Sequence, residues 1–185
     1  FIMDSVTRFA MAQREIGLAL GEPPTSKGYP PSALSLLPQL MERAGKEENK
    51  GSITAFFSVL VEGDDLSDPI ADQARSILDG HIVLSRELTD YGIYPPINIL
   101  NSASRVAKDI ISESQNLYAR KFRRLYALLK ENEMLIRIGS YQMGNDKELD
   151  EAIKKKALME QFLAQDENAL QPFEQSFQQL EEILR

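Results

Sequence analysis

The sequence predicts an α/β domain built on a parallel sheet, followed by an all-helical subdomain. In the first half, apolar runs rich in β-branched and aromatic residues alternate with segments of helical period. Beyond about residue 112, only the helical period remains. We therefore expect one domain over residues 1–107 and a helical one over residues 108–185.

The first elements are a strand and a helix. Phe1 to Asp4 is typical of the end of a buried parallel strand, so we expect the chain to begin inside a domain. A helix over residues 5–20 follows from the spacing of its apolar residues, and Gly21 with the prolines behind it ends that helix. The segment 21–31 holds four prolines and two glycines, which predicts a loop.

Two further strands alternate with helices. After a helix over about residues 32–44, the nine-residue run 53–61 is apolar on both faces and predicts a second buried strand. An acidic turn leads to a short helix over about residues 70–78 and to a third strand over residues 81–85. This alternation favours a parallel sheet that is covered on both faces.

The helical half begins with one long predicted helix, residues 114–138. Its outer face is basic, and such runs are usually solvated. A turn over residues 139–145 and helices over about residues 146–164 and 171–184 complete the chain. We expect the apolar side of the long helix to carry Leu117, Leu125, Leu128, Leu129 and Leu135, and the basic face to carry Arg120, Lys121, Arg123, Arg124 and Lys130.

Composition excludes several functions. With 185 residues, 43% hydrophobic content and a net charge of -7, the chain can fold but offers no basic field for nucleic acid. The lack of cysteine and the single histidine, His81, exclude disulfides, a zinc site and nucleophilic triads. No apolar run approaches the roughly 20 residues that span a bilayer. We expect a cytoplasmic protein.

Asp4 is the first candidate for chemistry. Ligands collect at the carboxyl ends of parallel strands, and a carboxylate there can hold the water shell of a magnesium ion. The alternative is that Asp4 caps the next helix. Arg8 lies one turn further on, where it could reach a phosphate or form an ordinary ion pair.

Two further candidates lie near the domain boundary. Arg105 follows small residues that leave its guanidinium room to project toward a transferring phosphoryl group, although a surface arginine has the same pattern. Tyr94 stands in a stiff turn before two prolines and could stack on a base or on a proline. The acids Asp64, Asp65 and Asp68 lack the spacing of a calcium loop.

Linked motifs carry a resemblance over residues 1–107. The segments MDSVTRFAMAQREIGLALGEPP, KGYPPS, VEGDDLSDP and SASRV resemble the catalytic subunits of rotary ATPases. Within that superfamily, the first two segments and VEGDD are similar to the flagellar and type III secretion export ATPases. Over the helical remainder the resemblance is loose and rests on length, helix content and residues 161–163.

The resemblance implies a RecA-like nucleotide domain in a homo-hexamer that uses ATP and Mg²⁺. It implies that Asp4 closes the Walker B strand and orders the metal through water, and that Arg8 faces the phosphates. It also implies that Tyr94 lies at the adenine and that Arg105 is the arginine finger offered to the adjacent subunit. Phe173, which no motif marks, is the candidate second aromatic contact of the adenine.

The resemblance also implies partners. The acidic loop with Asp64, Asp65 and Asp68 would face a central stalk protein. The helical domain and its basic face would meet export chaperones, substrates and the export gate, at the periphery of the inner membrane. The 185 residues contain no G-x-x-x-x-G-K-[ST] loop, so we expect this stretch alone to be inactive.

Two other functions fit part of the pattern. A subunit of a rotary ATP synthase or of a vacuolar-type enzyme shares the superfamily motifs. A non-catalytic assembly module would use the nucleotide fold only as a surface. A phosphate-binding loop with a glutamate after it would distinguish an enzyme from such a module.

Overall fold

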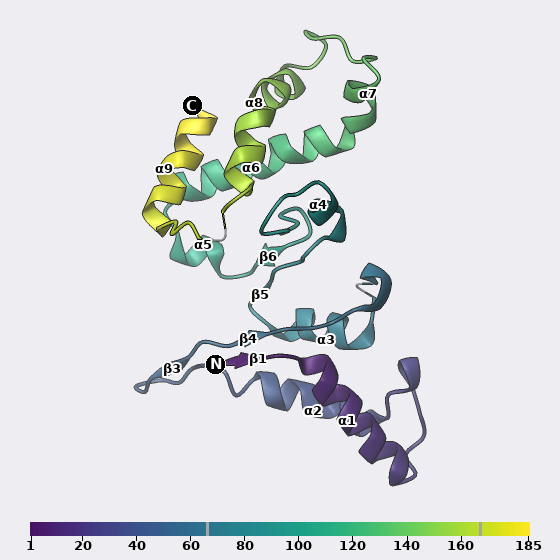
Figure 1. The fold of residues 1–185 in the computed structure, drawn as a ribbon. Coiled ribbons are helices and arrows are strands. Elements are labelled where there is room, and N and C mark those ends of the chain that lie inside the picture. Colours follow the sequence, from purple (N-terminus) through teal and green to yellow (C-terminus); the bar gives the residue numbers. More distant parts are fainter. Residues whose placement is uncertain (66, 167) are drawn as a thin grey trace. The chain divides into compact units, whose positions relative to one another are not determined.

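The computed structural model describes residues 1–65, 67–166 and 168–185, and these form two compact units. The first unit is Phe1–Asp79 and the second is Gly80–Arg185 (Figure 1). Residues 80–107, which the sequence analysis groups with the first domain, therefore lie in the second compact unit.

The first unit places a short parallel strand pair beside three helices. Strand β1 (Ile2–Met3) pairs in parallel with β4 (Phe56–Phe57), with Ile2 opposite Phe56. The remaining elements are α1 (Val6–Ala19), η1 (Ser26–Gly28), α2 (Pro31–Met41), η2 (Glu62–Asp64), α3 (Pro69–Ile77) and the antiparallel pair β2 (Gly45–Lys46) and β3 (Ser52–Ile53).

The core of the first unit lies where α1, α2 and α3 meet. The prediction of helices here is confirmed, because Ser5 caps α1, Pro31 opens α2 and Asp68 caps α3. The buried core residues are Val6, Ala10, Tyr29, Ala33, Leu37, Met41, Ile70 and Ala74.

The predicted burial of the strands on both faces is wrong for this chain. Ile2 is 78% exposed and Phe56 is 62% exposed. The run 53–61 does not form one strand, because only Ile53 and residues 56–57 pair, and they pair with different partners. Among the described residues, β1 and β4 are hydrogen-bonded only to each other, so no third strand flanks this pair.

The second unit is a helical bundle preceded by a short antiparallel pair. Strand β5 (Gly80–His81) pairs with β6 (Ala103–Ser104), and Leu84 bridges to Ile97. The predicted third parallel strand over residues 81–85 is therefore wrong. The chain folds back between the two paired segments, with an antiparallel bridge between Leu84 and Ile97, so these segments run antiparallel.

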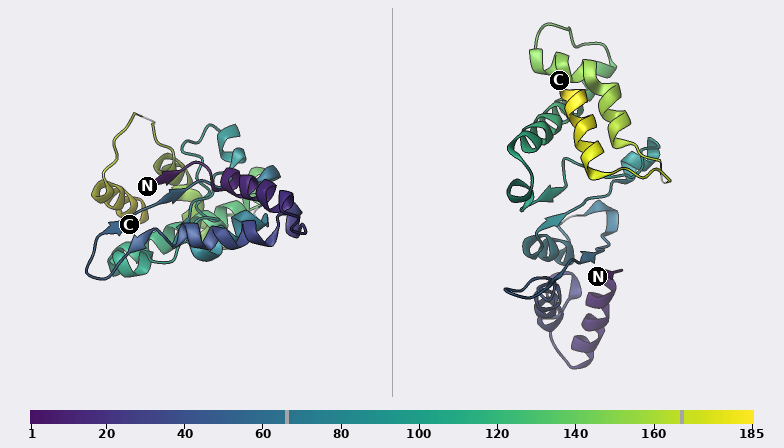
Figure 2. Two further views of the ribbon diagram at one scale, coloured as in Figure 1. Left: turned by 90° about the horizontal axis from the view of Figure 1, so that it is seen from below. Right: turned by 90° about the vertical axis from the view of Figure 1, so that its left-hand side faces the viewer.

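Six helices are described in the second unit. The long helix α6 packs against both α8 and α9, which also contact each other (Figure 2). The helices are α4 (Arg86–Asp90), α5 (Ala107–Ile110), α6 (Glu113–Glu131), α7 (Glu133–Arg137), α8 (Lys147–Leu163) and α9 (Phe173–Leu184). Their shared core contains Phe122, Leu125, Tyr126, Leu129, Ala152, Met159, Leu180 and Leu184.

The single helix predicted over residues 114–138 is interrupted. Asn132 has non-helical angles, φ -105° and ψ 9°, and its amide Nδ2 donates to the carbonyl of Leu128 at 2.9 Å. A side chain that bonds the backbone locally competes with the helix, which explains the break. Leu117 and Leu135 are exposed rather than part of the apolar side. No helix in the described ranges is long and apolar enough to cross a membrane.

Candidate nucleotide-site residues

The carboxyl ends of β1 and β4 bring Asp4 and Ser58 together. The hydroxyl of Ser58 donates to Asp4 Oδ1 at 2.6 Å, and its amide donates to the carbonyl of Met3 at 3.0 Å. The helix that follows is capped by Ser5, whose Oγ accepts from the amide of Arg8 at 3.3 Å. The alternative that Asp4 is the cap is therefore wrong, and its exposed carboxylate is available for another role.

The start of α1 is bonded to the chain that follows β4. The amide of Leu60 donates to Thr7 Oγ1 at 2.8 Å, and the amide of Val6 donates to the carbonyl of Ser58 at 2.9 Å. Sequence reasoning singled out neither Thr7 nor Ser58. The one available signal was a serine inside an otherwise apolar strand pattern.

The surroundings of Asp4 fit a magnesium ion held through water. Its Oδ2 has no hydrogen-bond partner in the described part of the chain, and the side chain is exposed. No cluster of three or more metal-binding side chains is found among the described residues, so Asp4 would contribute a single carboxylate to a metal ion. Mg²⁺ keeps several waters and needs only one or two carboxylates beside phosphate oxygens.

Arg8 is exposed on the first turn of α1. Within the described ranges it forms no ion pair, so the alternative of an ordinary helix ion pair has no support. A guanidinium at this place can bind an anion from outside the chain.

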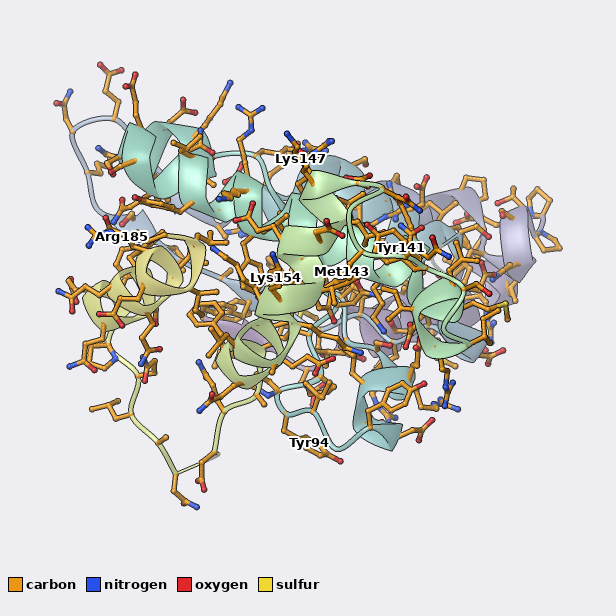
Figure 3. The ribbon with its side chains drawn as sticks, turned by 90° about the horizontal axis from the view of Figure 1, so that it is seen from above. Tyr94, Tyr141, Met143, Lys147, Lys154 and Arg185 are labelled. Carbon is orange, nitrogen blue, oxygen red and sulfur yellow. The ribbon has the colours of Figure 1, made fainter. Side chains whose placement is uncertain are left out.

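Tyr94 lies on an exposed turn of the second unit (Figure 3). Its carbonyl accepts from the amide of Gln165 at 2.6 Å, which joins the turn to the segment after α8. The ring is 54% exposed, so it has a face for stacking.

Phe173 is an exposed residue at the start of α9. Its ring is 61% exposed and packs edge-on against Phe177, with centroids 4.9 Å apart. No ring contact in the described part of the chain joins it to Tyr94, so the pairing of the two aromatic residues stays a prediction. Sequence reasoning missed Gln165 as a neighbour of the tyrosine turn.

Arg105 directly follows β6 and is exposed. The hydroxyl of Ser104 accepts from the amide of Ala107 at 3.1 Å, which fixes the passage from the strand into α5. Arg105 thus stands between a paired strand and a helix start.

The acidic loop is bonded to the proline-rich loop. Lys27 Nζ lies 2.7 Å from Asp65 and 3.4 Å from Asp68. The lysine and the hydroxyl and amide of Ser67 lower the pKa of Asp65 to about 2. Asp68 also caps α3. The side chain of Asp64 lies outside what the structure describes.

The basic face of α6 largely binds groups of its own unit. Arg124 forms a bidentate pair with Glu148 and lowers the pKa of that carboxyl. Lys121 pairs with Glu151 at 2.8 Å, Lys130 with Glu133 at 3.3 Å, and Arg123 donates to the carbonyls of residues 100 and 102. The run is therefore more than a solvated face.

Two family descriptions match this chain. Residues 1–104 match the ATP synthase alpha/beta family, nucleotide-binding domain, and residues 111–182 match the T3SS EscN ATPase C-terminal domain. The first match defines the class of the protein as a chain with a nucleotide-binding domain of the ATP synthase type.

Relatives and solved structures agree with these matches. A flagellum-specific ATP synthase of Helicobacter pylori (strain J99) is 99% identical over the whole chain, which covers 43% of that protein. The assembled ATPase EscN of the enteropathogenic E. coli type III secretion system has a TM-score of 0.96 at 47% identity, with coverage of 100% of this chain and 44% of EscN. EscN in complex with its central stalk EscO has a TM-score of 0.89 at 45% identity, with the same coverages.

The chain belongs to the family of flagellar and type III secretion ATPases. The resemblance read from its motifs is thereby confirmed, as is the fold class of a RecA-like parallel-sheet domain with a helical C-terminal part. The chain spans 43% of the length of the Helicobacter pylori relative and 44% of that of the assembled EscN.

Proposed function

We propose that the chain is part of an ATPase that couples ATP hydrolysis to protein export through a flagellar or type III secretion apparatus. The observation that carries the proposal is the 99% identity, over every residue of the chain, with a flagellum-specific ATP synthase. The position of Asp4 supports it, since the carboxylate lies at the carboxyl end of a parallel strand pair.

Each candidate residue then has a proposed role in binding the nucleotide or in its hydrolysis. Asp4, oriented by Ser58, holds the water shell of Mg²⁺, and Arg8 binds phosphate oxygens. The metal, when bound, neutralises charge on the phosphates. Tyr94 stacks on the adenine, with Phe173 as the candidate second aromatic contact, and Arg105 serves the site of a neighbouring subunit. The 185 residues contain no phosphate-binding loop, so other parts of the site come from the rest of the full-length protein.

The assembly and its partners extend this proposal. EscN is described as assembled and in complex with a central stalk, which supports a homo-hexamer around a stalk protein here. Export chaperones, export substrates and the export gate are the further partners that we propose. The proposed location is the cytoplasm, at the periphery of the inner membrane. The proposed domain boundary is at residues 107/108, and the gap between the two family matches, residues 105–110, supports it.

Arg105→Ala in the full-length protein tests the proposal. We expect the Mg²⁺-dependent ATPase rate to fall by roughly 10³ to 10⁵, as for other arginine fingers, while nucleotide binding remains. Arg86→Ala is the control, because Arg86 is also exposed in the second unit and makes no ion pair in the described ranges. Near-normal turnover of Arg105→Ala would refute the role assigned to this arginine.

A further inference from the structure

The chain segment that leads to Arg105 is held by side chains at three successive carbonyls. Arg123 Nη2 donates to the carbonyl of Leu100 at 3.2 Å, and Arg123 Nη1 donates to that of Ser102 at 3.1 Å. Between them, the carbonyl of Asn101 accepts from His81 Nε2 at 3.0 Å. In a surface loop such carbonyls usually accept hydrogen bonds from water. Three successive bonds from side chains therefore fix the position of this segment.

The guanidinium of Arg123 has a geometry that few other side chains could supply. Its planar fork donates to two acceptors at once, and bonds from a charged donor are stronger than neutral ones. The fork stands on α6, where the neighbouring residues Phe122 and Leu125 are buried in the helical core. Arg123 therefore ties the segment to a rigid helix.

The opposite side of the segment is fixed by β5. The pairing of β5 with β6 brings Gly80 so close that a Cβ there would lie 2.8 Å from the carbonyl oxygen of Ala103. The amide of Val83 also donates to Ser102 Oγ at 2.9 Å. Residues 100–104 are thus held between β5 and Arg123, and Arg105 is the next residue.

We propose that Arg123 is a positioning residue for Arg105. By fixing two carbonyls three and five residues before it, Arg123 sets the place from which the Arg105 guanidinium projects. This inference rests on the proposed function, in which Arg105 reaches a phosphoryl group. A misplacement of about 1 Å at such a group can lower the rate by about 10²-fold.

The experiment uses Arg123→Ala and Arg123→Lys in the full-length protein, with Arg124→Gln as the matched control. Arg124 is the adjacent residue of the same helix and pairs with Glu148 instead. We expect kcat of Arg123→Ala to fall about 10- to 100-fold while KM for ATP changes less than about twofold. Arg123→Lys, which lacks the fork, should be intermediate, and Arg124→Gln should stay near the parent.

A double variant separates positioning from a general loss of structure. In the Arg105→Ala background, Arg123→Ala should lower kcat no further, because the group that it positions is gone. Thermal melting of each variant checks that the fold persists. A multiplicative further loss in the double variant, or a normal kcat in Arg123→Ala, would overturn the positioning role. Normal turnover in Arg105→Ala alone would instead overturn the proposed function.

Discussion

Gly17→Ala tests how closely α1 must approach the loop before α2. Gly17 is buried, and a Cβ built on it would lie 2.6 Å from Pro30 Cγ and 2.9 Å from Ser32 Oγ. The serine hydroxyl can rotate away, but Pro30 is fully buried and its ring cannot. Alanine gains about 1 kcal/mol over glycine in helix propensity, while overpacking of this kind costs about 1–3 kcal/mol. Because the Pro30 ring cannot move aside, we place the overpacking cost at about 2–3 kcal/mol, which leaves a net loss of roughly 1–2 kcal/mol in the free energy of unfolding.

Urea unfolding of the chain, monitored by circular dichroism, measures the difference in the free energy of unfolding between Gly17→Ala and the parent. Gly51→Ala is the control, because a Cβ at Gly51 meets nothing within 4 Å and the residue does not have a positive φ. Its stability should stay within about 0.5 kcal/mol of the parent. If Gly17→Ala is as stable as the parent or more stable, the close packing of α1 on Pro30 is not what requires a glycine there.

Two further predictions concern Tyr94 and the acidic loop. In the full-length protein, Tyr94→Ala should weaken nucleotide binding by about 1–3 kcal/mol, the usual value of one base stacked on an aromatic ring, and Tyr94→Phe should not. Titration with a fluorescent nucleotide measures both, and equal affinities in all three proteins contradict stacking. For Asp65, the folded pKa of about 2 lies below the ordinary value of 3.8, so its pairing with Lys27 is intact above the ordinary pKa and is lost as the pH falls through about 2. Lys27→Ala should raise that pKa toward 3.8, which carboxyl NMR measures; an unchanged pKa would show that Lys27 is not its cause.

The starts of several helices could be predicted closely because the residues at each start determine where the helix begins. Ser5, Asp68 and Asp146 each cap the helix that follows within a residue or two of the predicted start. The interruption at Asn132 was missed, since an asparagine is tolerated in helices and only its bond to Leu128 shows the competition.

Contacts between residues that are far apart in the sequence could not be predicted from its hydrophobic pattern. Ser58 reaches Asp4 across 54 residues through the register of a parallel pair, and no short turn joins these two strands to fix that register from the sequence. A parallel strand was predicted over residues 81–85, whereas the structure has a strand at residues 80–81 with an antiparallel partner, because the residue pattern alone does not identify the neighbouring strand. The roles of Asp4 and Arg105 come from the linked motifs rather than from periodicity, and they stay predictions.

Arg123 and Arg124 show why a basic run cannot be interpreted from composition. The two residues are adjacent and of one type, yet successive residues of a helix point about 100° apart. One therefore faces the backbone before Arg105 and the other faces Glu148 on α8. A partner that meets this surface of α6 finds the guanidinium groups of Arg123 and Arg124 already bonded within the chain. The basic run by itself thus supports a role in holding Arg105 and α8 more directly than a role in binding export chaperones.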